Sequence, residues 1–186
     1  MARLPYVDPA TAPEEVRNLL ERLPVRLNIF RMMAHAQTNF RPLIRLGTSI
    51  LSEQKLSAKL RELAILGVAQ QSPARYEWIQ HVPVGKAMGI SDAQVEALER
   101  GDFAAACFSP DEQLVLRFTS ELVHDVRPSD GVFAALAQRF SPQEIVELVL
   151  AIGYYMMLAR LMETTAIDLD APAGQRIVGE ALKRRQ

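Results

Sequence analysis

The chain has 186 residues, a formal net charge of −1 and a hydrophobic content of 49%, which suits one domain or two small ones with a sizeable core. No long run of Lys or Arg precedes the last few residues. Because nucleic-acid binding relies on a basic footprint, we expect no nucleic-acid partner.

A single cysteine, Cys107, excludes an intramolecular disulfide and a CxxC redox pair. Its alanine-rich surroundings predict a packed thiol. The N-terminus lacks the apolar stretch of a secretory signal. The strongest apolar run is flanked by Glu144 and Glu147, so we expect no segment that spans a bilayer. These features predict a soluble, cytoplasmic protein with no membrane partner.

The N-terminal half is punctuated by helix start and stop signals. Residues 1–12 read as an extended arm. Helices are expected over residues 13–23, 26–37, 40–51, 57–70 and 72–88. Ser57 and the pair Ser72-Pro73 serve as helix starts, and Gly89 serves as a C-cap. Pro83 should kink the last of these helices.

Three serine-led capping boxes organise the C-terminal half, each with Gln or Glu three residues after the serine: Ser91 with Gln94, Ser109 with Glu112, and Ser141 with Glu144. They begin helices expected over 91–101, 109–124 and 142–167, with a further helix over 129–139. No stretch alternates with a period of two, so the fold class is all-α, with about eight helices.

We divide the chain into an arm and first helix (1–24), a helical domain (25–170) and a polar C-terminal tail (171–186). The segments LRELAILGVA and IVELVLAIGYY echo each other faintly, which is compatible with an internal duplication.

Three groups that can move protons lie close together in the sequence. Glu77 and His81 are four residues apart and share a helix face, and Glu62 lies one helix earlier. Histidine exchanges protons near neutral pH, and a nearby carboxylate can orient it. We interpret His81 as the proton donor or acceptor, Glu77 as its orienting group, and Glu62 as a group that holds or shares the proton.

Other interpretations remain open at this point. Glu77 and His81 could form a surface helix pair while Glu62 pairs with Arg61 or Arg75. The two glutamates and the histidine could also bind a metal, although two histidines four residues apart are absent. His35 is a pocket candidate on an apolar helix, and His124 suits a helix C-terminus.

The pocket around these groups has further candidates. Tyr76 and Trp78 could form its walls, and Arg61 or Arg75 could hold a substrate carboxylate through paired hydrogen bonds. No glycine-rich phosphate loop occurs, which argues against a nucleotide cofactor.

The segments RELAILGVA and YEWIQHVPVGKAMGIS resemble the carboxymuconolactone decarboxylase-like family, which includes the alkyl hydroperoxidase D-like proteins. FSPDEQLVLRFTSEL and FSPQEIVELVLAIGYYMMLARLME agree with it, so the resemblance covers about residues 25–170. It implies an alkyl hydroperoxidase D-like multi-helix bundle and an obligate homo-oligomer, commonly a dimer, trimer or hexamer.

The hydroperoxidase branch of that family uses a CxxC, a histidine four residues later and a glutamate on the preceding helix. In this sequence the resemblance places the histidine at His81 and the glutamate at Glu62, whereas Ala74 and Glu77 occupy the two cysteine positions. Peroxiredoxin activity is therefore implied by ancestry alone, since the disulfide cycle needs both thiols.

The decarboxylase branch needs neither a cofactor nor a cysteine, and the resemblance implies a lyase-like reaction that releases carbon dioxide and protonates the product. The favoured hypothesis is a metal-free, cofactor-free acid–base enzyme acting on a small carboxylic acid or lactone. The alternative is a peroxidase-related accessory protein that has lost the dithiol.

Overall fold

The computed structural model describes residues 1–183, and within them all regular secondary structure is helical. The helices are α1 (Glu14–Arg22), α2 (Asn28–Met33), α3 (Gln37–Ser52), α4 (Ala58–Gln71), α5 (Arg75–Ala87), α6 (Asp92–Glu99), α7 (Pro110–Asp125), α8 (Asp130–Arg139), α9 (Pro142–Thr165) and α10 (Gly174–Lys183). The all-α prediction is confirmed, with ten helices in this range where about eight were expected.

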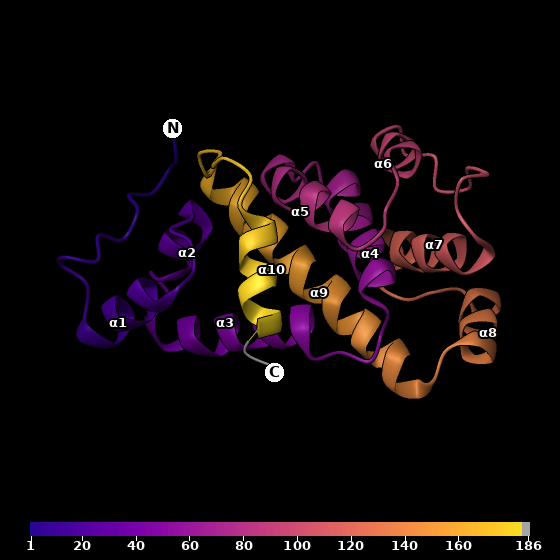
Figure 1. The fold of residues 1–186 in the computed structure, drawn as a ribbon, viewed down its shortest axis with the longest axis horizontal. Coiled ribbons are helices and arrows are strands. Elements are labelled where there is room, and N and C mark those ends of the chain that lie inside the picture. The colour runs from indigo at the N-terminus through magenta and orange to yellow at the C-terminus, as the bar shows by residue number, and fades with distance from the viewer. Residues whose placement is uncertain (184–186) are drawn as a thin grey trace.

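Two helices form the centre of the bundle. Helix α4 packs against α5, α7 and α9, and every residue from Arg61 to Ala69 in it is buried. Helix α9 runs diagonally through the molecule, with α1 to α3 on the left of the view and α6 to α8 on the right (Figure 1). The position of α4 between three other helices explains why its run from Arg61 to Ala69 is buried on every side.

Helix α9 corrects one expectation. By length and composition it is apolar enough to cross a membrane, whereas no such run was expected. Half of its apolar stretch is buried inside the fold, as in the core helix of a soluble protein. The cytoplasmic location stays a prediction.

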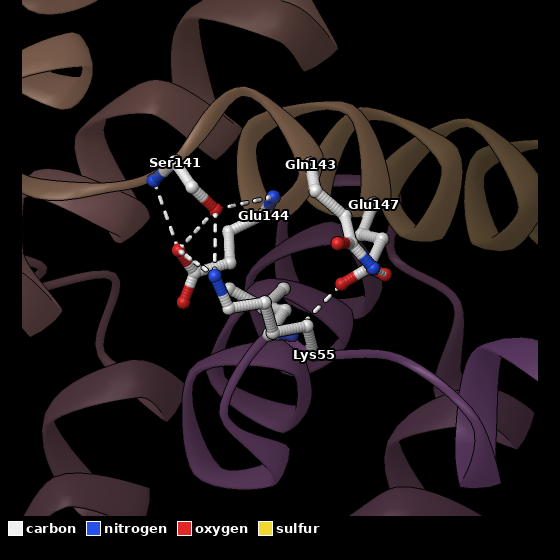
Figure 2. Close-up of polar contacts among 6 residues, drawn as sticks. Lys55, Ser141, Gln143, Glu144 and Glu147 are labelled. Atoms are coloured by element: carbon white, nitrogen blue, oxygen red, sulfur yellow. Dashed lines mark hydrogen bonds and ion pairs between the residues drawn. The ribbon is translucent and has the colours of Figure 1, made fainter.

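The three predicted capping boxes are all present. At the start of α9, the Ser141 hydroxyl accepts a hydrogen bond from the Glu144 backbone N–H, and the Glu144 carboxylate accepts one of 2.9 Å from the Ser141 N–H (Figure 2). Lys55 donates to the same hydroxyl, and the Glu147 carboxylate accepts from the Leu56 N–H. The start of α9 is thereby tied to the turn after α3.

One predicted helix start is displaced, and another lacks its side-chain cap. Helix α5 begins at Arg75 with Ala74 as its N-cap, while Ser72 is the C-cap of α4. Ser57 precedes α4 as predicted, but its side chain makes no capping hydrogen bond. Helix α2 is shorter than the predicted span of 26–37.

The C-terminal segment is the largest departure from expectation. Instead of only a polar tail, it forms helix α10, which packs against α5 and α3 and buries Val178. The connection before α10 is held by Gln80, whose side chain accepts from the Ala173 N–H at 2.8 Å and donates to the Ala171 carbonyl at 3.1 Å. The exit of the chain from α9 is thus fixed onto α5.

Candidate functional site

The centre of the candidate site is a hydrogen bond between α4 and α5. His81 Nδ1 lies 2.9 Å from Glu62 Oε2, and the Glu62 side chain is 0% exposed. A carboxylate only accepts, so the shared hydrogen belongs to Nδ1 and the His81 ring is fixed in orientation. Nε2, on the opposite edge of the ring, has no partner among the described residues.

Glu62 also faces a cation. Its second oxygen, Oε1, lies 3.4 Å from both Nε and Nη2 of Arg61, and both side chains are buried. The pairing of Glu62 with Arg61, one of the two open interpretations, therefore occurs together with the contact to His81. Arg61 balances the carboxylate from the side away from the imidazole.

Glu77 does not orient His81 as predicted, since Glu62 occupies the Nδ1 position. Both Glu77 carboxyl oxygens are buried without a hydrogen-bond partner in the described part of the chain. Burial, with a smaller contribution from the negative charge of Glu62, raises the pKa of Glu77 well above its usual range. At neutral pH this favours a protonated carboxyl that can donate a hydrogen bond.

Glu77 and His81 line a cavity of about 340 Å³, whereas Glu62 contacts His81 from outside its lining. Glu77 and His81 come from α5, and Tyr155 and Leu158 come from α9. Apolar side chains from α1 to α3 and the residues between these helices supply much of the remaining wall: Leu23, Leu27, Phe30, Met33, Ile44 and Leu51. Helix α10 contributes Ile177 and Val178 to the cavity wall. The site is thus enclosed by segments from both ends of the chain.

Tyr155 was not predicted as a site residue. Its ring lies edge-on to the His81 ring, with centroids 4.8 Å apart. Burial raises the pKa of Tyr155 well above its usual value, so the phenol stays protonated. The sequence carried no signal for this contact, because Tyr155 sits in a helix that reads as apolar core.

Several other predicted candidates lie outside the cavity. Trp78 packs in a separate core cluster, and Arg75 is exposed. His35 is exposed and contacts the Pro5 carbonyl through Nε2. Tyr76 does line the cavity, but its hydroxyl donates to Asp170 at 2.5 Å.

Two more predictions from the sequence concern Cys107 and a metal site. Cys107 is exposed, where a packed thiol was expected. Among residues 1–183, no group of three or more His, Cys, Asp or Glu side chains is placed to hold a metal ion.

The comparisons with known proteins agree with the resemblance seen in the sequence. Residues 38–121, which contain Glu62, Glu77 and His81, match the sequence model of the carboxymuconolactone decarboxylase family. No curated protein matches the chain.

Solved structures share the fold. An uncharacterized peroxidase-related protein from Silicibacter sp. TM1040 has a TM-score of 0.77 at 17% identity, covering 91% of this chain and 92% of its own. A protein with an alkylhydroperoxidase AhpD core from Ralstonia eutropha JMP134 gives 0.77 at 15%, covering 95% of each chain. The debrominase Bmp8, solved in complex with 2,3,4-tribromopyrrole, gives 0.72 at 16%, covering 97% of this chain and 96% of its own.

Proposed function

We propose that this carboxymuconolactone decarboxylase-like protein is a cofactor-free acid–base enzyme that acts on a small carboxylic acid or lactone. The observation that carries the proposal is the 2.9 Å contact between Glu62 and His81 at the wall of a mostly apolar cavity. A buried carboxylate that holds Nδ1–H leaves Nε2 to accept a substrate proton and stabilises the imidazolium that forms.

A lyase-like reaction fits these groups. When the bond between a carbon and its carboxylate breaks, carbon dioxide leaves and the electron pair stays on the carbon as an enolate. His81, once protonated, returns a proton to that carbon. Glu77 supplies a second carboxyl at the same wall, and burial keeps it in a form that can donate.

The test compares the native protein with His81→Gln in two assays. One measures carbon dioxide release from 4-carboxymuconolactone, and the other measures deuterium uptake from heavy water next to the carbonyl of simple lactones. We expect turnover in at least one assay and a loss of about 100-fold or more in His81→Gln. Absence of both activities in the native protein would overturn the proposal.

A second candidate is a peroxidase-related accessory protein. It is favoured by the shared fold with proteins described as peroxidase-related. Because Ala74 and Glu77 stand at the positions that the resemblance gives to thiols, peroxide turnover with a thiol reductant should not exceed background. Cys107→Ser should change nothing, and a peroxidase activity lost in that variant would favour thiol chemistry instead.

We also propose that the protein forms a homo-oligomer. Exposed apolar side chains follow one side of α9, at Val146, Val149, Leu150 and Met157. A soluble monomer rarely leaves such a stripe uncovered, so we infer that a second copy of the chain covers it.

A further inference from the structure

Some polar side chains that line the cavity already have hydrogen-bond partners in the fold, and others have none within residues 1–183. Gln80 holds the segment before α10, and the hydroxyls of Tyr76, Tyr154 and Thr48 donate to Asp170, the Leu43 carbonyl and the Ile44 carbonyl. These side chains line the cavity but have satisfied partners elsewhere. They offer little to a ligand.

The cavity-lining groups without a hydrogen-bond partner come from α5 and α9. They are the Glu77 carboxyl, the Nε2 of His81 and the hydroxyl of Tyr155, none of which has a hydrogen-bond partner in residues 1–183. Burying a carboxyl without a partner is costly, so Glu77 marks a place where a ligand would supply the missing contact.

Charge decides what kind of ligand can lie there. The nearest cation, Arg61, is buried and paired with Glu62, and it does not line the cavity. Arg22 does line it but is solvent-exposed, at the end of α1. A carboxylate at the polar wall would be stripped of water beside the negative Glu62, and within residues 1–183 the solvent-exposed Arg22 is the only cation in the cavity lining.

We propose that the cavity takes an uncharged, mostly apolar ring compound bearing one carbonyl oxygen, that Glu77 is the specificity residue that donates a hydrogen bond to that oxygen, and that the buried negative charge of Glu62 disfavours carboxylate ligands. This inference rests on the acid–base chemistry of the proposed function. Of the two proposed substrate classes it keeps neutral lactones and drops small carboxylic acids, so it favours proton exchange next to a carbonyl over decarboxylation, and it adds cyclic ketones as ligands of the same chemistry. The cavity volume suits a molecule of one or two small rings.

The proton-transfer step balances for such a substrate. His81 Nε2 takes a proton from the carbon next to the carbonyl, so the C–H bond breaks and an N–H bond forms. The electron pair moves into the enolate, whose oxygen accepts the hydrogen bond from Glu77. Return of the proton to carbon restores the neutral imidazole, and no oxidant or reductant is needed.

The experiment uses a matched pair of probes with one carbon skeleton, γ-phenyl-γ-butyrolactone and its ring-opened acid, 4-hydroxy-4-phenylbutyrate. Titration calorimetry at neutral pH should show the lactone binding at least about tenfold more tightly to the native protein. Glu77→Gln, which keeps a donor, should retain that preference. Glu77→Leu should lose roughly tenfold in lactone affinity while the acid is unaffected.

The outcomes separate this inference from the proposed function. Equal or tighter binding of the acid, unchanged lactone affinity in Glu77→Leu, or no binding of either probe would each overturn it. Circular dichroism of both variants checks that they fold. His81→Gln should bind the lactone like the native protein but lose deuterium exchange. If the native protein binds the lactone without exchanging deuterium, the acid–base function is contradicted while the ligand preference stands.

Discussion

Two buried glutamates in the site face opposite environments. Glu62 has a cation on one side and an imidazole on the other, so its charge is matched. Glu77 lies near that same negative charge and has no partner of its own within the described chain. A pair of carboxyls whose surroundings differ in this way is a frequent basis for separate acid and base roles.

The first prediction concerns the pH dependence of stability. The folded pKa of Glu77 lies above its unfolded value, so the contribution of this group to stability is fully present below the unfolded pKa. It falls as pH rises from there toward the folded pKa, because the unfolded chain releases the proton first. The loss is on the order of 1 kcal/mol per pH unit in that window.

Glu77→Gln cannot release this proton and should flatten the curve. The measurement is the free energy of unfolding in urea between weakly acidic and neutral pH, with exposed Glu53→Gln as the matched control. Parallel curves for the native protein and Glu77→Gln would show that Glu77 ionises normally in the fold.

At the scale of elements, a serine in the sequence predicted a side-chain cap correctly only where Gln or Glu follows three residues later. The boxes led by Ser91, Ser109 and Ser141 formed as expected, because their partners lie three residues away in the same turn. Ser57 and Ser72 are the same kind of residue without that partner, and neither side chain caps the helix that follows.

The second prediction follows from this contrast. Ser141→Ala removes the hydroxyl that accepts from the Glu144 N–H, and it should lower the free energy of unfolding by about 1 kcal/mol. Ser57→Ala, which removes no capping bond, should cost clearly less. Urea titration of the two variants measures both values, and equal losses would contradict a capping role for Ser141.

The third prediction concerns the docking of α10. A Cβ at Gly174 would lie 2.2 Å from the Gln80 carbonyl oxygen, a backbone atom that cannot move aside easily. Gly174→Ala should therefore displace α10 from α5 and open the cavity. Gly179→Ala, where a Cβ meets nothing within 4 Å, should be neutral or slightly stabilising, since alanine favours helix.

Hydrogen exchange of amides in α10 distinguishes the two glycine variants. Exchange should rise throughout α10 in Gly174→Ala and stay at the native level in Gly179→Ala. Unchanged protection in Gly174→Ala would mean that α5 and α10 adjust without separating.

At the scale of the whole molecule, the all-α class and a site shared by the helices that carry Glu62 and His81 could be anticipated, the class from helical periodicity and the site from residue spacing and the resemblance. The exchange of roles between Glu62 and Glu77 could not. Spacing by four places Glu77 and His81 on one face, but the partner of His81 is set by how α4 packs on α5. The residues of the cavity wall could not be predicted either, because they come from α1 to α3, α9 and α10, which are far apart in the sequence.

The exposed side of α9 gives the last prediction. Gly153 lies between Leu150 and Met157 on this side, and a Cβ there would meet nothing within 4 Å, so another helix could approach the backbone closely. Burying the stripe against a second copy would remove Val149 and Leu150 from water, and a charge at either position would oppose this.

Sedimentation velocity at micromolar concentration should therefore show an oligomer for the native protein and a monomer for Leu150→Glu. Exposed Gln138→Glu on α8 serves as the matched control for added charge and should keep the native size. A native protein that sediments as a monomer would mean that the stripe is not covered by a second copy. An oligomer that survives Leu150→Glu would place the contact on another surface, because a glutamate in an apolar helix interface costs several kcal/mol when it has no partner.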